Sequence, residues 1–135
     1  MQLTEHRNER ELFVRHAGAD SVTVVDRRFE RSLVVAADRV LEDFPAHSVA
    51  DLDAATVASV LALQPEVVLL GTGPRVIFPT QAVLAEFLKR GIGLETMDNA
   101  AAARTFNVLV GEGRRAVAIF LLPDASRPDQ PRPDH

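Results

Sequence analysis

Residues 66–74 read Glu-Val-Val-Leu-Leu-Gly-Thr-Gly-Pro, and this stretch decides the fold. Its four consecutive apolar residues are typical of a parallel strand that is buried on both faces. The Gly-Thr-Gly-Pro that follows predicts a tight loop, and Arg75 comes directly after it. In open α/β sheets, ligands usually bind just past the carboxyl end of a strand. The stretch therefore predicts an α/β sheet and the place where a site should be sought.

The segments around this strand alternate between helix and strand patterns. Asp53, Thr80 and Asp98 are predicted N-caps because their side-chain oxygens can accept from the free amides of a helix. Gly91 is predicted to end the second helix in the left-handed conformation. This order predicts right-handed crossovers and parallel strands covered by helices. The expected helices span 54–63, 81–90 and about a dozen residues from 99, and the expected strands span 67–70, 92–97 and 116–122.

The N-terminal part of the chain shows a different pattern. Short segments rich in β-branched residues occupy 12–16, 21–25 and 33–37. Between them lie the turn-like residues 17–20 and the charged stretch 26–31. These features predict an antiparallel meander of three strands.

Length and composition bound the domain organisation. The chain has 135 residues and is 47% hydrophobic, enough to build one sizeable core. We therefore expect a flexible lead-in over 1–10 and a single α/β domain over 11–123. Residues 124–135 hold three prolines and no large apolar residue, so we expect a disordered tail.

Composition also argues against several classes of function. The net charge is −4 and the basic residues are scattered along the chain, so no positive stripe is available to bind a phosphate backbone. We therefore do not expect nucleic acid as a partner. There is no Cys, hence no disulfide or thiolate metal site, and there is no Trp or Tyr to anchor an interface. The four histidines lack metal-binding spacing, no G-x-S-x-G elbow occurs, and we expect no catalytic residue, metal or cofactor.

The N-terminus lacks the apolar core of a signal peptide, and the longest apolar run is far shorter than the ~20 residues of a membrane-spanning helix. We expect a cytoplasmic protein that is not embedded in a membrane.

The loop after the central strand is the first candidate site. Gly71, Thr72 and Gly73 could bring backbone amides close to an anion, and Arg75 could hold that anion. The third glycine of a dinucleotide fingerprint is missing, however, and Pro74 removes an amide donor. A purely structural turn is the alternative interpretation.

Asp98 and Asn99 end the next strand and would lie beside that loop if the two strands are neighbours. Asp98 could be a general base or a polar ligand contact. An aspartate at this position is also what the start of a helix favours, through capping and the helix dipole. A carboxylate seated there would compete with a phosphate.

Arg104 and Asn107 follow four alanines at 100–103, which would let a helix approach a sheet closely. Their i, i+3 spacing puts them on one helix face, where they could make a joint polar contact. An ion pair between Arg104 and an acid such as Glu112 is the alternative.

Three motifs taken together resemble one family of small α/β proteins. They are GTGPRVIFP at 71–79, IGLETMDNAAAARTFNVL at 92–109 and EGRRAVAIFLL at 112–122. The family is domain-of-unknown-function family 498, whose eukaryotic member is the mitochondrial complex I assembly factor 3. The resemblance covers roughly residues 10 to 122 and implies a three-layer fold with a mixed central sheet and an N-terminal antiparallel portion. It implies no established enzymatic activity.

The resemblance also singles out positions. The family often has Cys and Tyr where this chain has Ala103 and Phe106, so a chemistry carried by a thiol or a phenol would be lost here. The positions that match, and are candidate site or framework residues, are Gly71, Gly73, Arg104, Asn107, Glu112 and Arg114.

Two functional hypotheses follow, with a third in reserve. The first is a non-catalytic module that binds a protein partner or assists the assembly of a respiratory or membrane complex. The second is a small-molecule or anion-binding protein, or a weak enzyme, that uses the loop at 71–75 with Asp98, Asn99, Arg104 and Asn107. The third is a self-associating structural domain, which the apolar content would allow.

Overall fold

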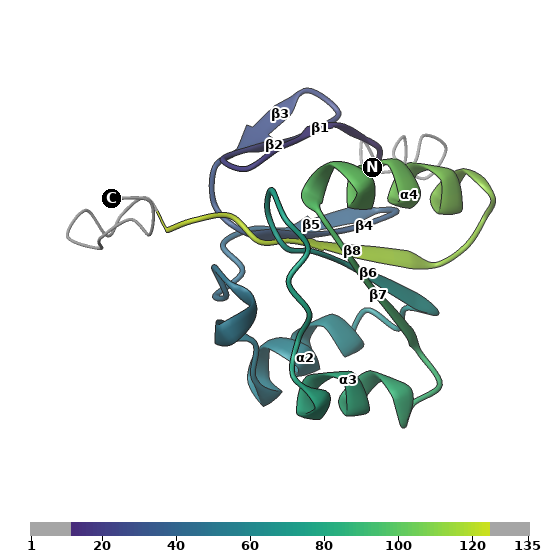
Figure 1. Cartoon of the computed structure of the whole chain (residues 1–135). Helices are drawn as coiled ribbons and strands as arrows, with labels where there is room; N and C mark the ends of the chain where they lie inside the picture. Colours follow the sequence, from purple (N-terminus) through teal and green to yellow (C-terminus); the bar gives the residue numbers. More distant parts are fainter. Residues whose placement is uncertain (1–11, 125–135) are drawn as a thin grey trace.

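The computed structural model describes residues 12–124 and builds two sheets and three α-helices from them (Figure 1). The predicted lead-in over 1–10, and the predicted tail from residue 125 onward, lie outside the described residues. The strands are β1 (Val14–Ala17), β2 (Val22–Val24), β3 (Arg27–Phe29), β4 (Leu33–Ala36), β5 (Arg39–Leu41), β6 (Val67–Gly71), β7 (Gly93–Met97) and β8 (Ala116–Phe120). The helices are α2 (Ala54–Leu61), α3 (Gln81–Leu88) and α4 (Asn99–Gly111), with a short 3₁₀ turn, η1 (Val49–Asp51), before α2.

The larger sheet has five strands in the order β5-β4-β8-β6-β7. β6 runs parallel to both β7 and β8, while β4 runs antiparallel to β8 and to β5. Every residue of β6 and β8 is buried, as expected for interior strands that are covered on both faces. The sheet is therefore mixed, with parallel strands at its core.

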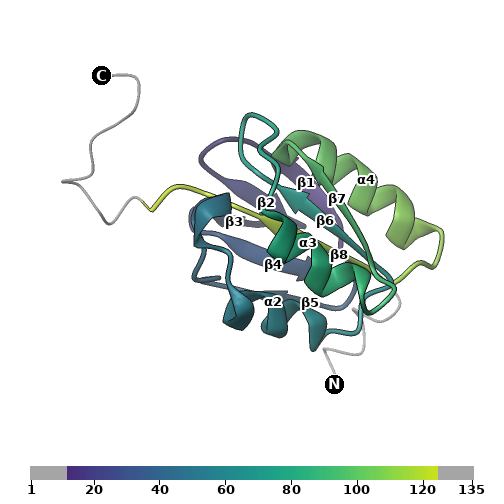
Figure 2. The same ribbon diagram turned by 60° about the horizontal axis from the view of Figure 1, so that its bottom comes forward.

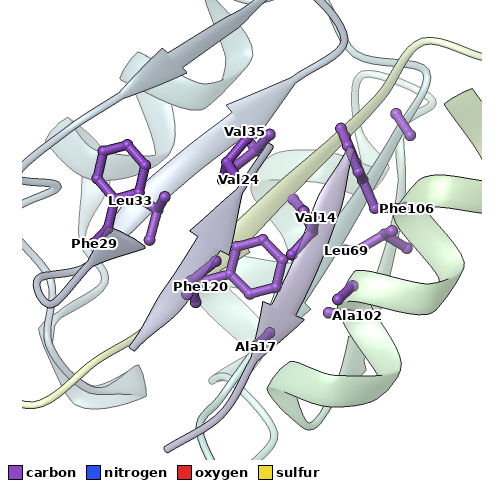
Figure 3. Close-up of a cluster of buried hydrophobic side chains, with 14 of the residues drawn as sticks. Val14, Ala17, Val24, Phe29, Leu33, Val35, Leu69, Ala102, Phe106 and Phe120 are labelled. Carbon is purple, nitrogen blue, oxygen red and sulfur yellow. The ribbon is translucent and has the colours of Figure 1, made fainter. Parts of the chain in front are cut away.

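Helices and a small sheet cover the two faces and make three layers. α2 and α3 pack on one face, whereas α4 and the β1-β2-β3 sheet cover the other (Figures 1 and 2). Successive side chains of a strand point to opposite faces, so Val68 and Leu70 join the cluster under α2 and α3. Leu69 joins the cluster under α4, together with Phe106 and Phe120 (Figure 3). This is the α/β architecture that the sequence predicts.

The N-terminal meander differs from the prediction in its third strand. The small sheet takes β3 from the charged stretch, while residues 33–36 leave it and pair with β8 in the larger sheet. A two-residue turn at Val25 and Asp26 joins β2 to β3, with a φ of 56° at Val25. β3 escapes prediction because two of its three residues are exposed arginines and only Phe29 is buried. All four residues of β4 are buried, which suits the interior of a larger sheet.

The predicted helix starts are confirmed. The side chains of Asp53, Thr80 and Asp98 accept hydrogen bonds from backbone amides three residues on, at 2.9, 3.3 and 2.7 Å. Each bond satisfies one of the donors that a helix start leaves free. Gly91 has a φ of 73°, the left-handed conformation predicted for the end of the second helix. α2 and α3 are each two residues shorter at their C-terminal ends than the predicted ranges.

Glu66 ties the start of β6 to the start of β8. Its carboxylate accepts from the Arg115 backbone amide at 2.9 Å and from the Arg114 guanidinium at 3.0 Å. The Arg115 amide, and then the Arg114 side chain, lower the pKa of Glu66 below its ordinary value of 4.5. Both donors favour the ionised form of the carboxyl group.

Glu66→Gln is expected to cost stability at neutral pH and less in acid. A lowered folded-state pKa gives a contribution that is present above the unfolded pKa, near 4.5, and lost as the pH falls through the folded value. Urea unfolding of wild type and Glu66→Gln at pH 7 and at about pH 3 measures the difference. An equal difference at both pH values would show that the carboxylate charge contributes nothing.

Candidate functional site

The carboxyl ends of β6 and β7 lie side by side, as the sequence hypothesis requires. Gly71 pairs with Met97 in the parallel register. Beyond that pair, the Thr72 amide donates to the Met97 carbonyl at 3.0 Å, and the Asn99 amide donates to the Gly73 carbonyl at 2.8 Å. The loop at 71–75 and residues 97–99 therefore share one edge of the sheet.

Asn99 lies at the centre of this edge and is fully buried. Its Oδ1 accepts from the Gly73 amide at 3.1 Å, and its Nδ2 donates to the carbonyls of Gly18 and Leu121 at 2.9 and 3.2 Å. The side chain thus joins the β1–β2 turn, the end of β8 and the loop after β6. Its amide group is directed at the protein's own backbone.

Gly71 allows the start of α4 to approach the sheet. A Cβ atom at this position would lie 2.4 Å from the Asn99 Oδ1 and 3.1 Å from the Ile119 carbonyl oxygen. No side chain fits there without displacing one of these groups. Gly73 is needed for a different reason, because its φ of 99° is a conformation that other residues rarely adopt.

Thr72 organises the remainder of the loop. Its buried hydroxyl donates to the Arg75 carbonyl and accepts from the Ile77 amide at 3.1 Å. The chain is thereby folded back around one side chain. The Arg75 side chain stays exposed, with no ion pair to the acids of residues 12–124.

Asp98 serves as the N-cap of α4, accepting from the Ala101 amide at 2.7 Å. The structure thus shows Asp98 in the N-cap role, the alternative to a ligand contact. The carboxylate and the polar atoms of Asn99 and Thr72 all take part in hydrogen bonds that fix this end of the sheet.

Arg104 and Asn107 make no joint contact, although both are on α4. Asn107 accepts from the Val14 amide and donates to the Val14 carbonyl, both at 2.9 Å, and so fastens the helix to β1. Arg104 is exposed on the outer side of the helix. The alternative pairing of Arg104 with Glu112 is also wrong: Glu112 is exposed and forms no ion pair within the described part of the chain, whereas Arg114 pairs with Glu66. Helical spacing predicts proximity but not the direction in which each side chain extends.

The sequence reasoning missed an exposed apolar segment next to the predicted loop. Val76, Ile77 and Phe78 are 46, 53 and 74% exposed, three large apolar residues in a row. All seven phenylalanines lie within the described residues, and Phe78 is the most exposed of them. The available signal was the run Val-Ile-Phe, which lies between Pro74 and Pro79. The lack of Trp and Tyr therefore does not leave the surface without an aromatic side chain.

No cluster of three His, Asp or Glu side chains within residues 12–124 could hold a metal ion. Among the helices described, the longest has 13 residues, and none is long and apolar enough to cross a bilayer.

Comparison with solved structures agrees with this fold. The chain is 44% identical to a Xanthomonas campestris protein whose NMR structure superposes with a TM-score of 0.76, covering 82% of this chain and 83% of that one. A crystal structure of a Bordetella parapertussis protein is 35% identical with the same TM-score, covering 84% of this chain and 97% of that one.

Comparison with named proteins gives two kinds of relative. NADH dehydrogenase [ubiquinone] 1 alpha subcomplex assembly factor 3 of Danio rerio is 39% identical over 79 residues, which are 58% of this chain and 45% of that protein. The match thus spans less than half of the assembly factor. A Francisella tularensis protein named 13 kDa major membrane protein is 27% identical over 94 residues, which are 69% of this chain and 76% of that protein.

The family model for proteins of unknown function DUF498/DUF598 matches residues 14–121, which include both sheets and all three α-helices. The resemblance noted from the three motifs is confirmed, and this chain belongs to the DUF498/DUF598 family.

Proposed function

We propose that this chain is a non-catalytic module that binds a protein partner and assists the assembly of a membrane-associated respiratory complex. The observation that carries the proposal is the exposed segment Val76, Ile77 and Phe78. The similarity to an assembly factor of NADH dehydrogenase supports the choice of complex.

The exposed segment has the properties of a binding surface. Single exposed apolar residues are ordinary on protein surfaces, whereas larger exposed apolar patches are typical of surfaces that contact a partner, and this segment exposes three large apolar side chains in a row. The Thr72 hydroxyl holds the Arg75 carbonyl and the Ile77 amide, so the segment is presented on a loop tied at its base. A surface that is already ordered loses less conformational entropy on binding.

The double substitution Ile77→Ser and Phe78→Ser is expected to abolish assembly of NADH dehydrogenase, because it removes the apolar side chains of the binding surface. The protein should stay folded, since both side chains are more than half exposed. The gene is deleted in the organism that encodes it and restored with wild type or with variants. Native gels of the membranes then measure the amount of assembled NADH dehydrogenase. The deletion should lower that amount, and the double variant should fail to restore it.

Leu88→Ser is the matched control, because Leu88 is 67% exposed at the end of α3, away from the loop. It should restore assembly as wild type does. Normal amounts of the complex in the deletion strain would refute the assembly role. Full restoration by the double variant would refute the choice of surface.

Ligand binding at the loop stays a prediction. Among the residues proposed to bind a ligand, the side chains of Thr72, Asn99 and Asn107 form hydrogen bonds with the protein's own backbone. The exposed guanidinium of Arg75 is the group at this loop best placed to meet an anion. Self-association and a cytoplasmic location likewise stay predictions.

A further inference from the structure

A groove lies at the opposite end of the sheet from the loop at 71–75. It has a volume of about 390 Å³, which falls within the range of small-molecule sites. Its walls are residues 36–39, around the β4–β5 turn, and residues 62–64, which follow α2, and its floor is Arg115 with the first two residues of β8. The groove shares no residue with the exposed apolar segment or with the predicted loop site.

The groove exists because two neighbouring strands separate at this end. The antiparallel pairing of β4 with β8 reaches Val35 and Ala118 and goes no further. β4 then turns into β5 through Ala37 and Asp38. Four of the ten lining residues are alanines, whose small side chains leave the space unfilled.

Two arginines line the groove and come from different elements, Arg115 from the residue before β8 and Arg39 from the first residue of β5. Arg115 is held in place, because its backbone amide donates to Glu66 at 2.9 Å and its Nε donates to the Gln64 carbonyl at 3.1 Å. These bonds leave the terminal nitrogens of the guanidinium available. Arg39 is the first residue of β5, and its Nε makes a 3.4 Å contact with the neighbouring Asp38.

The charges and the lining select the class of ligand. The charged lining residues are two arginines and one acid, Asp38, so the lining carries a net positive charge. The groove therefore favours an anion. Leu63, Ala37 and Ala62, which are half-buried or exposed, supply apolar surface beside the guanidiniums. A bare inorganic ion would leave those walls in contact with water.

We propose that this groove binds a small organic anion, with a carboxylate held by Arg39 and Arg115 and a short apolar body against Ala62 and Leu63. The inference does not depend on the proposed assembly function, because it concerns different residues.

The test titrates isotope-labelled full-length protein with sodium hexanoate and follows the backbone amides by two-dimensional NMR. Acetate supplies the charge alone, and hexanol supplies the apolar chain alone. Hexanoate is expected to cause saturable shifts confined to residues 36–39, 62–64 and 115–117. Its affinity should exceed that of either partial probe by about tenfold or more, because each of these lacks one half of the recognition.

Substitutions then locate the site. Arg39→Gln and Arg115→Gln should each weaken hexanoate by about tenfold, the usual value of one charge-assisted contact. Arg28→Gln removes the same charge from β3, on the small sheet, and should leave the affinity unchanged. Ala62→Leu fills the groove from an exposed position and should abolish binding without loss of either arginine.

Equal affinity for hexanol and hexanoate would overturn the proposal, because it would show that charge plays no part. So would equal affinity for acetate, which would show that the walls play no part. Shifts spread over the whole surface, or unchanged in Ala62→Leu, would show that the groove is not the site. The amide spectrum of each variant reports directly whether it is folded.

Discussion

Phe106→Ala is expected to destabilise the protein by about 3–5 kcal/mol, the usual cost of removing a buried aromatic side chain. Phe106 is fully buried on α4 and belongs to the cluster that also contains Leu69 and Phe120 (Figure 3). Its ring packs where α4 meets the interior strands of the larger sheet. Because domains of this size are stable by only about 5–15 kcal/mol, the loss would be a large part of the total.

Phe78→Ala makes the same chemical change at a position that is 74% exposed. It should alter the free energy of unfolding by no more than about 0.5 kcal/mol. Urea unfolding followed by circular dichroism measures both variants, and the slope with denaturant should stay constant if only stability changes. A loss of less than about 1 kcal/mol for Phe106→Ala would mean that the layers can collapse around the missing ring. In that case the difference between Phe106→Ala and Phe78→Ala would not report the contribution of burial to stability.

The features that the sequence predicts well are those set by neighbouring residues. An N-cap is a contact between a side chain and an amide three residues on, so Asp53, Thr80 and Asp98 could be identified without knowing the fold. The pairing of β6 with β7 follows from one crossover through α3, which the order of the elements already implies. Local chemistry and short connections thus account for most of the fold.

The features that the sequence does not reveal depend on distant residues. β4 carries the same apolar pattern as a meander strand, and only its pairing with β8, more than eighty residues later, places it in the larger sheet. The exposed segment at Val76 and Ile77 has the composition of a buried strand. In the structure these residues belong to no strand, and the Thr72 hydroxyl binds the Arg75 carbonyl and the Ile77 amide instead. Periodicity cannot show either outcome.

The candidate site shows the same division. The adjacency of residues 71–75 and 97–99 is a consequence of parallel pairing and could be predicted. The role of Asn99 could not, because its three side-chain partners, Gly18, Gly73 and Leu121, are 81, 26 and 22 residues away in the sequence. A polar residue at the start of a helix resembles a ligand contact until its partners are known.

Asn99→Ala is expected to cost about 3 kcal/mol or more, since three backbone groups lose their partner at once. The buried Gly73 amide and Leu121 carbonyl would be left unsatisfied at about 1–3 kcal/mol each, and the half-buried Gly18 carbonyl would lose its partner as well. Asn107→Ala also removes two hydrogen bonds to backbone, both to Val14, but at a half-buried position that water can reach. It should cost only about 1 kcal/mol. Urea unfolding compares the two, and equal losses would contradict the role assigned to burial.

Asn99→Asp distinguishes the contribution of the hydrogen bonds to stability from the contribution of packing. The substitution keeps the size of the side chain and the acceptor for the Gly73 amide, but it replaces the donor to Gly18 and Leu121 with an oxygen. At pH 7 a carboxylate would face two carbonyl oxygens in a buried position, whereas in acid a protonated carboxyl could donate to one of them. The helix dipole favours an acid at the first position of α4 by only about 0.3–1 kcal/mol, too little to offset this loss. The stability deficit of Asn99→Asp relative to wild type should therefore shrink between pH 7 and pH 4, while that of Asn99→Ala stays constant. A deficit for Asn99→Asp that does not change with pH would show that the two carbonyls find other donors.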